Sequence, residues 1–325
     1  MTRTDLRADL TLLHREISSS LDGYPPFLAP LARHVFLGGG KKRRGELLLI
    51  IGRLLSTPRR DTLSAAAAAE IVHMATLVHD DILDGGRLRR RRASLHLEYG
   101  TALALLFGDL IFTRGIAALN RIGNASLTDL LLATVRSLCV GELMEAEYTG
   151  KFPWDERTYT RIIALKTAPL FAFVCEAPAL LAGTDREKRR VLGRFGANLG
   201  MSYQIIDDCL DFAPRSEDLG KNRLMDIKNA VPSLPLLLAG RKPCLRAEVR
   251  RLLAKKRDGA MRERIGSLIR THGLVRAAAM HANSYLVKAR ADMAFVTTWG
   301  RPRAARVLEG YVEEQARAIA HCATW

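Results

Sequence analysis

Apolar residues recur at the spacing of an α-helix along most of this chain, and this pattern constrains the fold more than any other feature. They fall three or four residues apart, as in the run Leu127, Leu130, Leu131, Thr134 and Leu138. No stretch shows the apolar and polar alternation of a strand bounded by turn residues. Hydrophobic residues make up 48% of the 325 residues, enough for one large core. No break between the helical runs is long or polar enough to serve as an interdomain linker. The sequence therefore predicts an all-α helical bundle, with residues 1–325 as a single domain.

Cysteine usage and apolar segments indicate a cytoplasmic protein without a transmembrane segment. The five cysteines are odd in number, scattered and never paired at metal-ligand spacing, which favours a reducing compartment and argues against a zinc site. The N-terminal residues carry acids and lack the apolar core of a secretory signal. The longest apolar stretch, Thr167 to Gly183, is interrupted by Glu176 and two prolines, and it is short for a bilayer.

The chain is strongly basic, with 50 Lys and Arg against 34 Asp and Glu, a net charge of +16. Such an excess suits nucleic acid, an anionic membrane surface or a heavily phosphorylated substrate. The basic residues are spread along the chain, no nucleic-acid-binding motif is present, and aromatics do not alternate with arginines. We therefore expect no nucleic-acid partner.

Two clusters of aspartates share the spacing D-D-x-x-D, and each follows an apolar helical stretch. The clusters are Asp80, Asp81 and Asp84, and Asp207, Asp208 and Asp211. Crowded carboxylates beside an apolar wall repel one another unless cations compensate them. Mg²⁺ takes oxygen ligands and is commonly held by a few carboxylates together with substrate phosphates. One copy of the motif is more readily interpreted as a solvated helix end, but two copies with identical spacing favour a magnesium-dependent diphosphate site.

Cationic residues follow each aspartate cluster and form a third group near the N-terminus. They are Arg87 and Arg89 to Arg92 after the first cluster, Lys221, Arg223 and Lys228 after the second, and Lys41 to Arg44 after the glycines at 38–40. Arginine forks and lysine point charges suit phosphate oxygens, and glycine lets the backbone approach an anion closely. Neutralisation of the aspartates, or a solvated basic run, is the plainer alternative for each group.

On these residues, the chain resembles the trans-isoprenyl diphosphate synthases of the polyprenyl synthetase family, which includes farnesyl and geranylgeranyl diphosphate synthases. The likeness runs from about Gly38 to the C-terminal helices. It rests on Gly39-Gly40-Lys41 with Arg44, His73, Asp80 to Asp84, Arg89-Arg90, Gly108-Asp109, Lys166-Thr167, Tyr203-Gln204, Asp207 to Asp211, Leu219-Gly220-Lys221, Asp226 and Ser233-Leu234-Pro235.

The resemblance implies an isoprenoid synthase fold, the class I prenyltransferase bundle of ten or more helices around a central cavity, usually in a homodimer. It implies a prenyltransferase that condenses isopentenyl diphosphate with an allylic diphosphate, head to tail and trans, to a linear prenyl diphosphate. The six aspartates would bind three magnesium ions carrying the allylic diphosphate. The other implied site residues are Arg89, Lys166 and Lys221 for the charge of that diphosphate, Thr167 and Gln204 at the reacting centre, and Gly40, Lys41, Arg44, His73 and Arg90 for isopentenyl diphosphate.

The chain departs from the family pattern at several positions close to these motifs. Gly45 replaces a usual proline, and Arg91 replaces a usual glycine. Val231 stands where the family usually carries a lysine that contacts the allylic diphosphate. Leu224 and Ala230 replace usual glycines, so we expect the loop after the second motif to take a different path.

Product length is predicted from the helix that enters the first motif. Ala75 and Thr76, about one turn before Asp80, are small where short-chain relatives carry a bulky ring. We therefore expect a product of twenty carbons or more. A ring from elsewhere could still close the cavity, although each candidate is equally well explained as a core residue; the candidates are Phe107, Phe112, Phe171 and Phe173.

Two alternative functions follow from the departures. One is a divergent member that acts as a terpene cyclase, although cyclases usually lack a second D-D-x-x-D and a site for isopentenyl diphosphate. The other is a non-catalytic partner subunit of a synthase, although such subunits commonly lose the aspartates that this chain retains.

Overall fold

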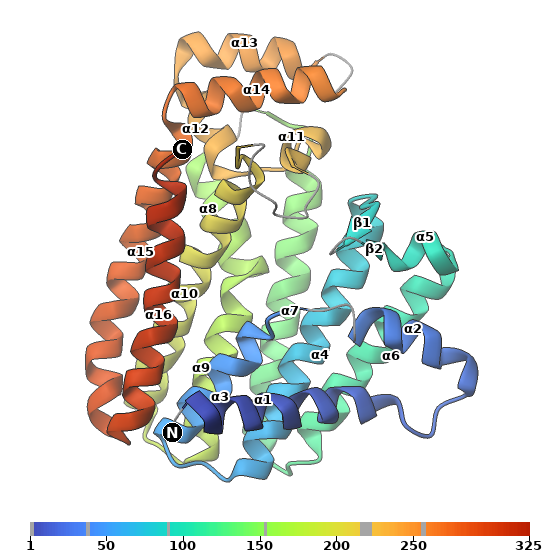
Figure 1. Ribbon diagram of the computed structural model, residues 1–325, viewed down its shortest axis with the longest axis vertical. Coiled ribbons are helices and arrows are strands. Elements are labelled where there is room, and N and C mark those ends of the chain that lie inside the picture. The colour runs from blue at the N-terminus through green and yellow to red at the C-terminus, as the bar shows by residue number, and fades with distance from the viewer. Residues whose placement is uncertain (1–2, 37–39, 90–91, 153–154, 215–222, 255–257) are drawn as a thin grey trace. The chain divides into compact units, whose positions relative to one another are not determined.

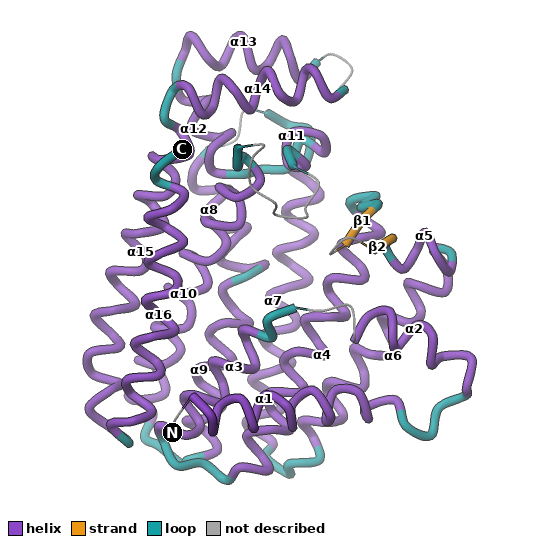
Figure 2. Tube along the Cα trace, in the orientation of Figure 1, coloured by secondary structure: helices purple, strands orange, loops and turns teal. Residues whose placement is uncertain are grey.

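A computed structural model describes residues 3–36, 40–89, 92–152, 155–214, 223–254 and 258–325, and it confirms the all-α prediction (Figures 1 and 2). The α-helices of the described residues are α1 (Arg3–Ser18), α2 (Ala29–Phe36), α3 (Arg43–Leu54), α4 (Arg59–Leu83), α5 (Leu95–Tyr99), α6 (Thr101–Asn120), α7 (Ala125–Tyr148), α8 (Glu156–Lys166), α9 (Ala168–Leu181), α10 (Arg186–Asp211), α11 (Met225–Asn229), α12 (Leu234–Arg241), α13 (Pro243–Leu253), α14 (Gly259–Thr271), α15 (Leu274–Val296) and α16 (Pro302–Cys322). Short 3₁₀ turns cover Ser19–Leu21, Pro26–Leu28 and Thr297–Trp299.

A short hairpin follows the first aspartate motif and was not predicted from the sequence. Its strands, β1 (Leu88–Arg89) and β2 (Arg92–Ala93), pair antiparallel, with Leu88 opposite Ala93. They are the only strands in the described part of the chain. The hairpin places Arg89 beside the end of α4.

The structure groups into two compact units. The first comprises the described residues of Met1–Thr134, Ala172–Gly193 and Met293–Tyr311. The second comprises those of Val135–Phe171, Arg194–Asp292 and Val312–Trp325. The first aspartate motif belongs to the first unit and the second motif to the second unit.

Helix α4 forms the centre of the first unit because its N-terminal half is packed on every side. Ala65–Ala69 are fully buried, and their small side chains allow neighbouring helices to approach closely. Helix α6 is one of these neighbours. A Cβ added to Gly108 would lie 2.3 Å from Nε2 of His79, and one added to Gly115 would lie 2.9 Å from Cγ2 of Val72. The two helices are therefore antiparallel, with Gly108 opposite His79 and Gly115 opposite Val72.

The second unit brings α7, α8 and α10 together through two further glycines. A Cβ on Gly141 of α7 would lie 2.4 Å from the backbone nitrogen of Lys166, and one on Gly200 of α10 would lie 2.9 Å from Cα of Ala168. Helix α8 starts at a capping aspartate, Asp155, whose side chain accepts a hydrogen bond from the backbone nitrogen of Thr158. These contacts fix Lys166 at the end of α8 and beside α7.

Among the described residues, α6 alone is a helix of sufficient length and apolar composition to cross a bilayer. The pair α8 and α9, bent by 41° at their junction, meets the same requirement only if taken together. Helix α6 packs against α4 through Gly108 and Gly115.

Candidate active site

The first aspartate motif lies in the last turn of α4, and its three carboxylates face different surroundings. Asp81 is buried, and its Oδ2 accepts a 2.6 Å hydrogen bond from Nε of Arg89. The backbone of Gly86 also returns to this turn, because its nitrogen donates to the carbonyl oxygen of Asp81 at 2.9 Å. Asp80 is half-buried and Asp84, which ends the helix, is exposed. Asp81 therefore anchors the hairpin, and the outer two aspartates remain open to solvent.

The charge of Arg89 is stabilised by the whole motif. Burial lowers the pKa of Arg89, but the hydrogen bond to Asp81 and the charges of Asp81, Asp80 and Asp84 outweigh burial and raise that pKa above its usual value. Arg89 is thus a charged side chain of the site that is paired with the buried Asp81.

A small cavity of about 40 Å³ lies beside the Asp81–Arg89 ion pair in the first unit. It is lined by His34, Val35, Met74, Leu77, Val78, Asp81, Arg89, Arg92, Ser94 and Leu95. Five of these residues are apolar, and three others are the partners of the ion pair and a second arginine. The cavity therefore combines an apolar surface with charges suited to phosphate.

Two of the residues predicted to hold isopentenyl diphosphate touch each other at the start of α3. Nη1 of Arg44 lies 2.8 Å from Nε2 of His73 on α4. Gly40 and Lys41 precede this turn and are exposed. Arg90, the fifth member of the predicted group, lies outside the described residues. The structure thus brings Arg44 and His73 into contact, shortly after the exposed residues Gly40 and Lys41 in the chain.

Lys42 belongs to the basic group Lys41 to Arg44, but the sequence analysis assigned it no site role of its own. Its backbone is left-handed, with a φ of 46°, and its side chain is buried. Its Nζ lies 3.2 Å from the sulfur of Met74. The neighbouring Arg43 stacks 3.8 Å from the ring centre of Tyr311, whose hydroxyl donates to the carbonyl oxygen of Arg43. This basic segment is therefore held against the protein rather than extended into solvent.

Glu70 fixes the first turn of α3 to α4, a role that the sequence analysis also missed. Its carboxylate is buried, and Oε1 accepts a 2.7 Å hydrogen bond from the backbone nitrogen of Gly45. Proline has no N–H group, so this bond depends on the departure from the usual family residue. A Cβ at Gly45 would lie 2.7 Å from Cδ2 of Leu13, so the site also has little room for a larger residue. A carboxylate inside the apolar run 65–72 was the signal available in the sequence.

In the second motif, at the end of α10, the middle aspartate is again the buried one. Asp208 accepts hydrogen bonds from the hydroxyl of Tyr159 at 2.6 Å, from Nε2 of Gln204 at 2.9 Å and from the backbone nitrogen of Leu234 at 3.1 Å. Burial raises the pKa of Asp208 to about 7, against the lowering effect of these hydrogen bonds. Asp207, one residue earlier, is exposed. Asp208 therefore holds α10 to α8 and to the start of α12.

The third aspartate of this motif organises the following loop. Asp211 accepts hydrogen bonds from the backbone nitrogens of Met225 and Asp226, both at 3.0 Å. It therefore caps α11 from the end of α10. Burial, together with the charges of Asp211 and Asp208, raises the pKa of Asp226 well above its usual value. Asp208, Asp211 and Asp226 therefore lie close enough for their charges to interact, and carboxylate oxygens are ligands that Mg²⁺ prefers.

The residues predicted at the reacting centre form a chain that ends on the second motif. The hydroxyl of Thr167 donates to Oε1 of Gln204 at 2.6 Å, and Gln204 donates in turn to Asp208. Lys166 pairs with Glu142 at 2.9 Å and with Glu145. Thr167 and Gln204 are thus linked to Asp208, and Lys166, the residue before Thr167, is paired with two glutamates of α7.

The loop after the second motif retains two left-handed residues at the positions of the missing glycines. Leu224 has a φ of 57° and Ala230 a φ of 53°, and both are buried. At these two residues the backbone adopts the conformation that glycine favours, and the rest of the path after the second motif lies in residues 215–222, outside the described residues. Val231 is half-buried, and its nitrogen donates to the carbonyl oxygen of Asp226. Lys221 lies outside the described residues, as does the departure at Arg91.

The aspartates suit magnesium as carboxylate donors, although the protein alone does not form a complete metal cage. Among the described residues, no group of three His, Cys, Asp or Glu side chains converges on one metal position. Each motif instead offers two at least partly exposed carboxylates, Asp80 with Asp84 and Asp207 with Asp211. Mg²⁺ is commonly bound through one or two carboxylates together with substrate phosphates. The arrangement fits that mode of binding.

Of the phenylalanines considered as a floor for the cavity, Phe107, Phe171 and Phe173 are fully buried. Phe112 on α6 is half-buried. Burial of these three rings fits either a core residue or a cavity floor, and Phe112 is the ring with remaining accessible surface.

The helices and the two carboxylate motifs beside basic side chains define an all-α, diphosphate-binding type of protein. The sequence model of the polyprenyl synthetase family matches residues 25–269. The chain belongs to the polyprenyl synthetase family.

Individual relatives agree with this assignment. The chain is 30% identical to heptaprenyl diphosphate synthase component 2 of Bacillus subtilis, over 77% of this chain and 72% of that protein. It is 31% identical to octaprenyl diphosphate synthase of Escherichia coli, over 71% and 72% of the two chains. The crystal structure of a polyprenyl synthase from Caulobacter crescentus, complexed with calcium and isoprenyl diphosphate, superposes with a TM-score of 0.88 at 31% identity, covering 98% and 95% of the chains. These relatives confirm the predicted isoprenoid synthase fold.

Proposed function

We propose that this chain is a prenyltransferase that condenses isopentenyl diphosphate with an allylic diphosphate, head to tail and trans, to a linear prenyl diphosphate of twenty carbons or more. The observation that carries this proposal is the shared architecture of the two aspartate motifs. In each, the middle carboxylate is buried and hydrogen-bonded, and the outer two are at least partly exposed. The relatives named above are heptaprenyl and octaprenyl diphosphate synthases, which supports a linear product over a cyclised one.

The metal ions that we propose are three magnesium ions, as the family resemblance implies, which the aspartates would hold together with the allylic diphosphate. Bound magnesium supplies positive charge that stabilises the departing diphosphate. We assign the ligand role chiefly to Asp80, Asp84 and Asp207, because these carboxylates are at least partly exposed. Asp81 and Asp208 position the motifs, which their buried hydrogen bonds support.

The cationic side chains divide between the two substrates. Arg44 and His73, with Gly40, Lys41 and Arg90, hold the diphosphate of isopentenyl diphosphate, and the 2.8 Å contact between Arg44 and His73 supports their common role. We assign Arg89, Lys166 and Lys221 to the charge of the allylic diphosphate. Charge that develops on the leaving group is stabilised more in the transition state than in the ground state.

The reaction that we propose breaks one carbon–oxygen bond and forms one carbon–carbon bond. The carbon–oxygen bond of the allylic diphosphate breaks, the electron pair leaves with the diphosphate, and the double bond of isopentenyl diphosphate attacks the allylic cation. One proton is then lost to the departed diphosphate. Thr167 and Gln204 line the reacting centre, and their hydrogen-bonded chain to Asp208 keeps both side chains ordered.

Product length depends on the space beneath the first motif. Ala75 is small and fully buried. From the antiparallel register of α4 and α6, Ile111 and Phe112 lie at the level of Ala75 and Thr76. The small side chains of Ala75 and Thr76 leave the cavity open at this level, so that a chain of twenty carbons or more can extend past it, and we assign to Phe112 the ring that borders this passage.

The assembly we propose is a homodimer in the cytoplasm, with residues 1–325 forming one polyprenyl synthetase domain. Helix α6 carries large exposed apolar side chains that a second copy would cover, namely Leu103, Leu105 and Leu106. The five cysteines are free, which suits a reducing compartment. Two of the relatives are named as component 2 of a synthase, so an assembly with a different subunit is the alternative that the measurement below must separate.

The test is mass spectrometry of products from the purified chain with magnesium, isopentenyl diphosphate and C5, C10, C15 or C20 allylic primers. A linear diphosphate of at least twenty carbons is expected, and Phe112→Ala should lengthen it while Ala75→Phe shortens it. Asp207→Ala serves as the inactive control. Failure to consume isopentenyl diphosphate with every primer would overturn the proposal for the chain alone and favour the partner-subunit alternative. A cyclic hydrocarbon product would favour the cyclase.

A further inference from the structure

A second basic cavity lies in the first unit, far from the aspartate motif. Its volume is about 330 Å³, and it is lined by Asp5, Ala8, Arg53, Arg59 and Arg301. Arg59 begins α4, and Asp80 lies 21 residues further along the same helix. At a rise of about 1.5 Å per residue, this places the cavity roughly 30 Å from the first motif. The cavity is therefore separate from the candidate active site.

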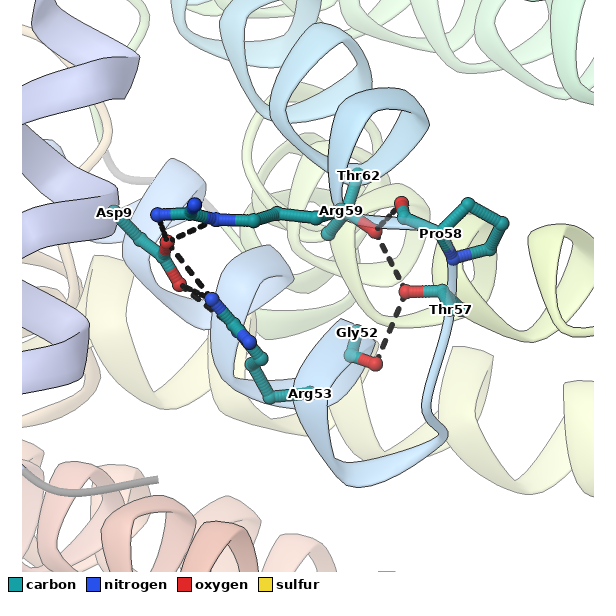
Figure 3. Close-up of polar contacts among 7 residues, drawn as sticks. All are labelled: Asp9, Gly52, Arg53, Thr57, Pro58, Arg59 and Thr62. Atoms are coloured by element: carbon teal, nitrogen blue, oxygen red, sulfur yellow. Dashed lines mark hydrogen bonds and ion pairs between the residues drawn. The ribbon is translucent and has the colours of Figure 1, made fainter.

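A buried carboxylate holds two of the three arginines together (Figure 3). Asp9 of α1 is only 1% exposed. Its Oδ2 lies 2.8 Å from Nη2 of Arg53, and its Oδ1 lies 2.6 Å from Nη2 of Arg59. The two arginine side chains remain 33% and 49% exposed. One internal carboxylate thus fixes two guanidinium groups beside each other and leaves part of each directed to the cavity.

The third arginine is placed by its backbone rather than by an ion pair. The backbone nitrogen of Arg301 donates to the carbonyl oxygen of Leu54 at 3.3 Å. A Cβ on the preceding Gly300 would lie 2.0 Å from that oxygen, so this close approach requires glycine. Within the described residues, no carboxylate forms an ion pair with the Arg301 side chain, which is exposed. The cation is therefore available at the cavity wall.

The charges around the cavity do not cancel. Three arginines carry +3, and Asp5 with Asp9 carries −2, which leaves a net charge of +1. The positive ends of two helices add to it, because α4 begins at Arg59 and α16 begins at Pro302, next to Arg301. A purely structural ion cluster accounts for Asp9, Arg53 and Arg59, but it gives no role to Arg301.

We propose that this cavity binds the phosphate or diphosphate group of a small anion, independently of magnesium and apart from the prenyl transfer site. Guanidinium forks from α3, α4 and the start of α16 suit the several oxygens of a tetrahedral anion. The cavity is large enough for a diphosphate with part of its substituent. A dissolved phosphorylated compound is the expected source, and a phospholipid headgroup carries the same chemistry.

The experiment is calorimetric titration of inorganic diphosphate into the full chain with EDTA present, which suppresses magnesium-dependent binding at the aspartates. Arg301→Gln is compared with the matched control Arg306→Gln, an exposed arginine one turn further along α16. The wild type and the control should bind diphosphate with the same affinity, and Arg301→Gln should weaken this affinity at least about tenfold. Without ligand, the thermal midpoint of Arg301→Gln should equal that of the wild type. Equal diphosphate binding by Arg301→Gln and the wild type would overturn the proposal.

Two further measurements separate the sources and the functions. Sedimentation with phosphatidylcholine vesicles, with and without phosphatidic acid, shows whether a lipid phosphate occupies the site: binding lost in Arg301→Gln assigns the phosphate group to lipid, and no vesicle binding assigns it to a dissolved anion. Prenyl transfer by Arg301→Gln should equal that of the wild type when no extra diphosphate is added. If Arg301→Gln loses diphosphate binding in the calorimeter but keeps its prenyl transfer activity, the result supports this site and leaves the proposed function unaffected.

Discussion

Replacing Asp208 with alanine should lower the free energy of unfolding by about 3 kcal/mol, whereas the same change at Asp207 should alter it by no more than about 0.5 kcal/mol. The removed carboxylate is the acceptor for the hydroxyl of Tyr159 and the backbone nitrogen of Leu234, and both of these residues are buried. Each buried donor left without an acceptor costs about 1–3 kcal/mol. The third donor, on the half-buried Gln204, can turn to water. Part of the loss is offset because the variant no longer buries a carboxyl group whose pKa is raised to about 7.

The assay is urea unfolding followed by circular dichroism, at neutral pH and without magnesium, with midpoints compared at a common slope. Asp207 is the matched control because it is the adjacent residue in the same helix but is exposed. Turnover should fall in both variants, so activity alone does not separate the two roles. Equal unfolding midpoints for the two variants would refute the assignment of Asp208 to a positioning role.

Three further predictions concern the departures from the family pattern. Ala230→Gly should change the free energy of unfolding by less than about 1 kcal/mol, because relief of the left-handed backbone offsets the lost methyl group. In the same urea assay, Ala278→Gly inside α15 should cost about 2 kcal/mol, and similar losses in the two variants would contradict the backbone argument. Val231→Lys should lower the KM for the allylic diphosphate by at least about threefold in steady-state kinetics, because it adds a cation beside the second motif, and an unchanged KM would count against this. Gly45→Ala should lower the thermal midpoint, because the new Cβ meets a side chain at 2.7 Å and overpacking costs about 1–3 kcal/mol. The control Gly310→Ala, whose Cβ meets nothing within 4 Å, should raise the midpoint, and a rise in both variants would refute the packing argument.

The sequence was sufficient for the helical architecture and for the location of both aspartate motifs. Helical spacing of apolar residues depends only on the local chain, and D-D-x-x-D places its first and last residues on one helical face whatever surrounds them. The aspartate that turns inward was not predictable. That choice depends on distant partners: Arg89 for Asp81, and Tyr159 with Leu234 for Asp208.

Backbone conformation was the second limit on the sequence interpretation. The replacement of glycine by Leu224 and Ala230 suggested a different loop path, because residues with a Cβ disfavour a positive φ by roughly 1–2 kcal/mol. The structure keeps φ positive at both residues. Burial of both side chains and the cap that Asp211 provides for α11 stabilise this loop in spite of that cost. Local propensity was thus overridden by packing that the sequence does not reveal.

Two of the cations that we assign to the allylic diphosphate already have carboxylate partners. Arg89 is paired with Asp81, and Lys166 is paired with Glu142 and Glu145. Such pairing orders long side chains before substrate arrives, and each of these side chains otherwise carries about 2 kcal/mol of rotamer entropy. It also sets a condition on the ligand, because the paired carboxylates repel a bare diphosphate as it approaches the cations. A diphosphate that brings metal ions changes this balance, since the same carboxylates then attract the incoming complex. On the proposed assignment of Arg89 and Lys166, the pairing favours a metal-bound diphosphate over the free anion, so that one set of residues both admits the allylic substrate and stabilises its leaving group.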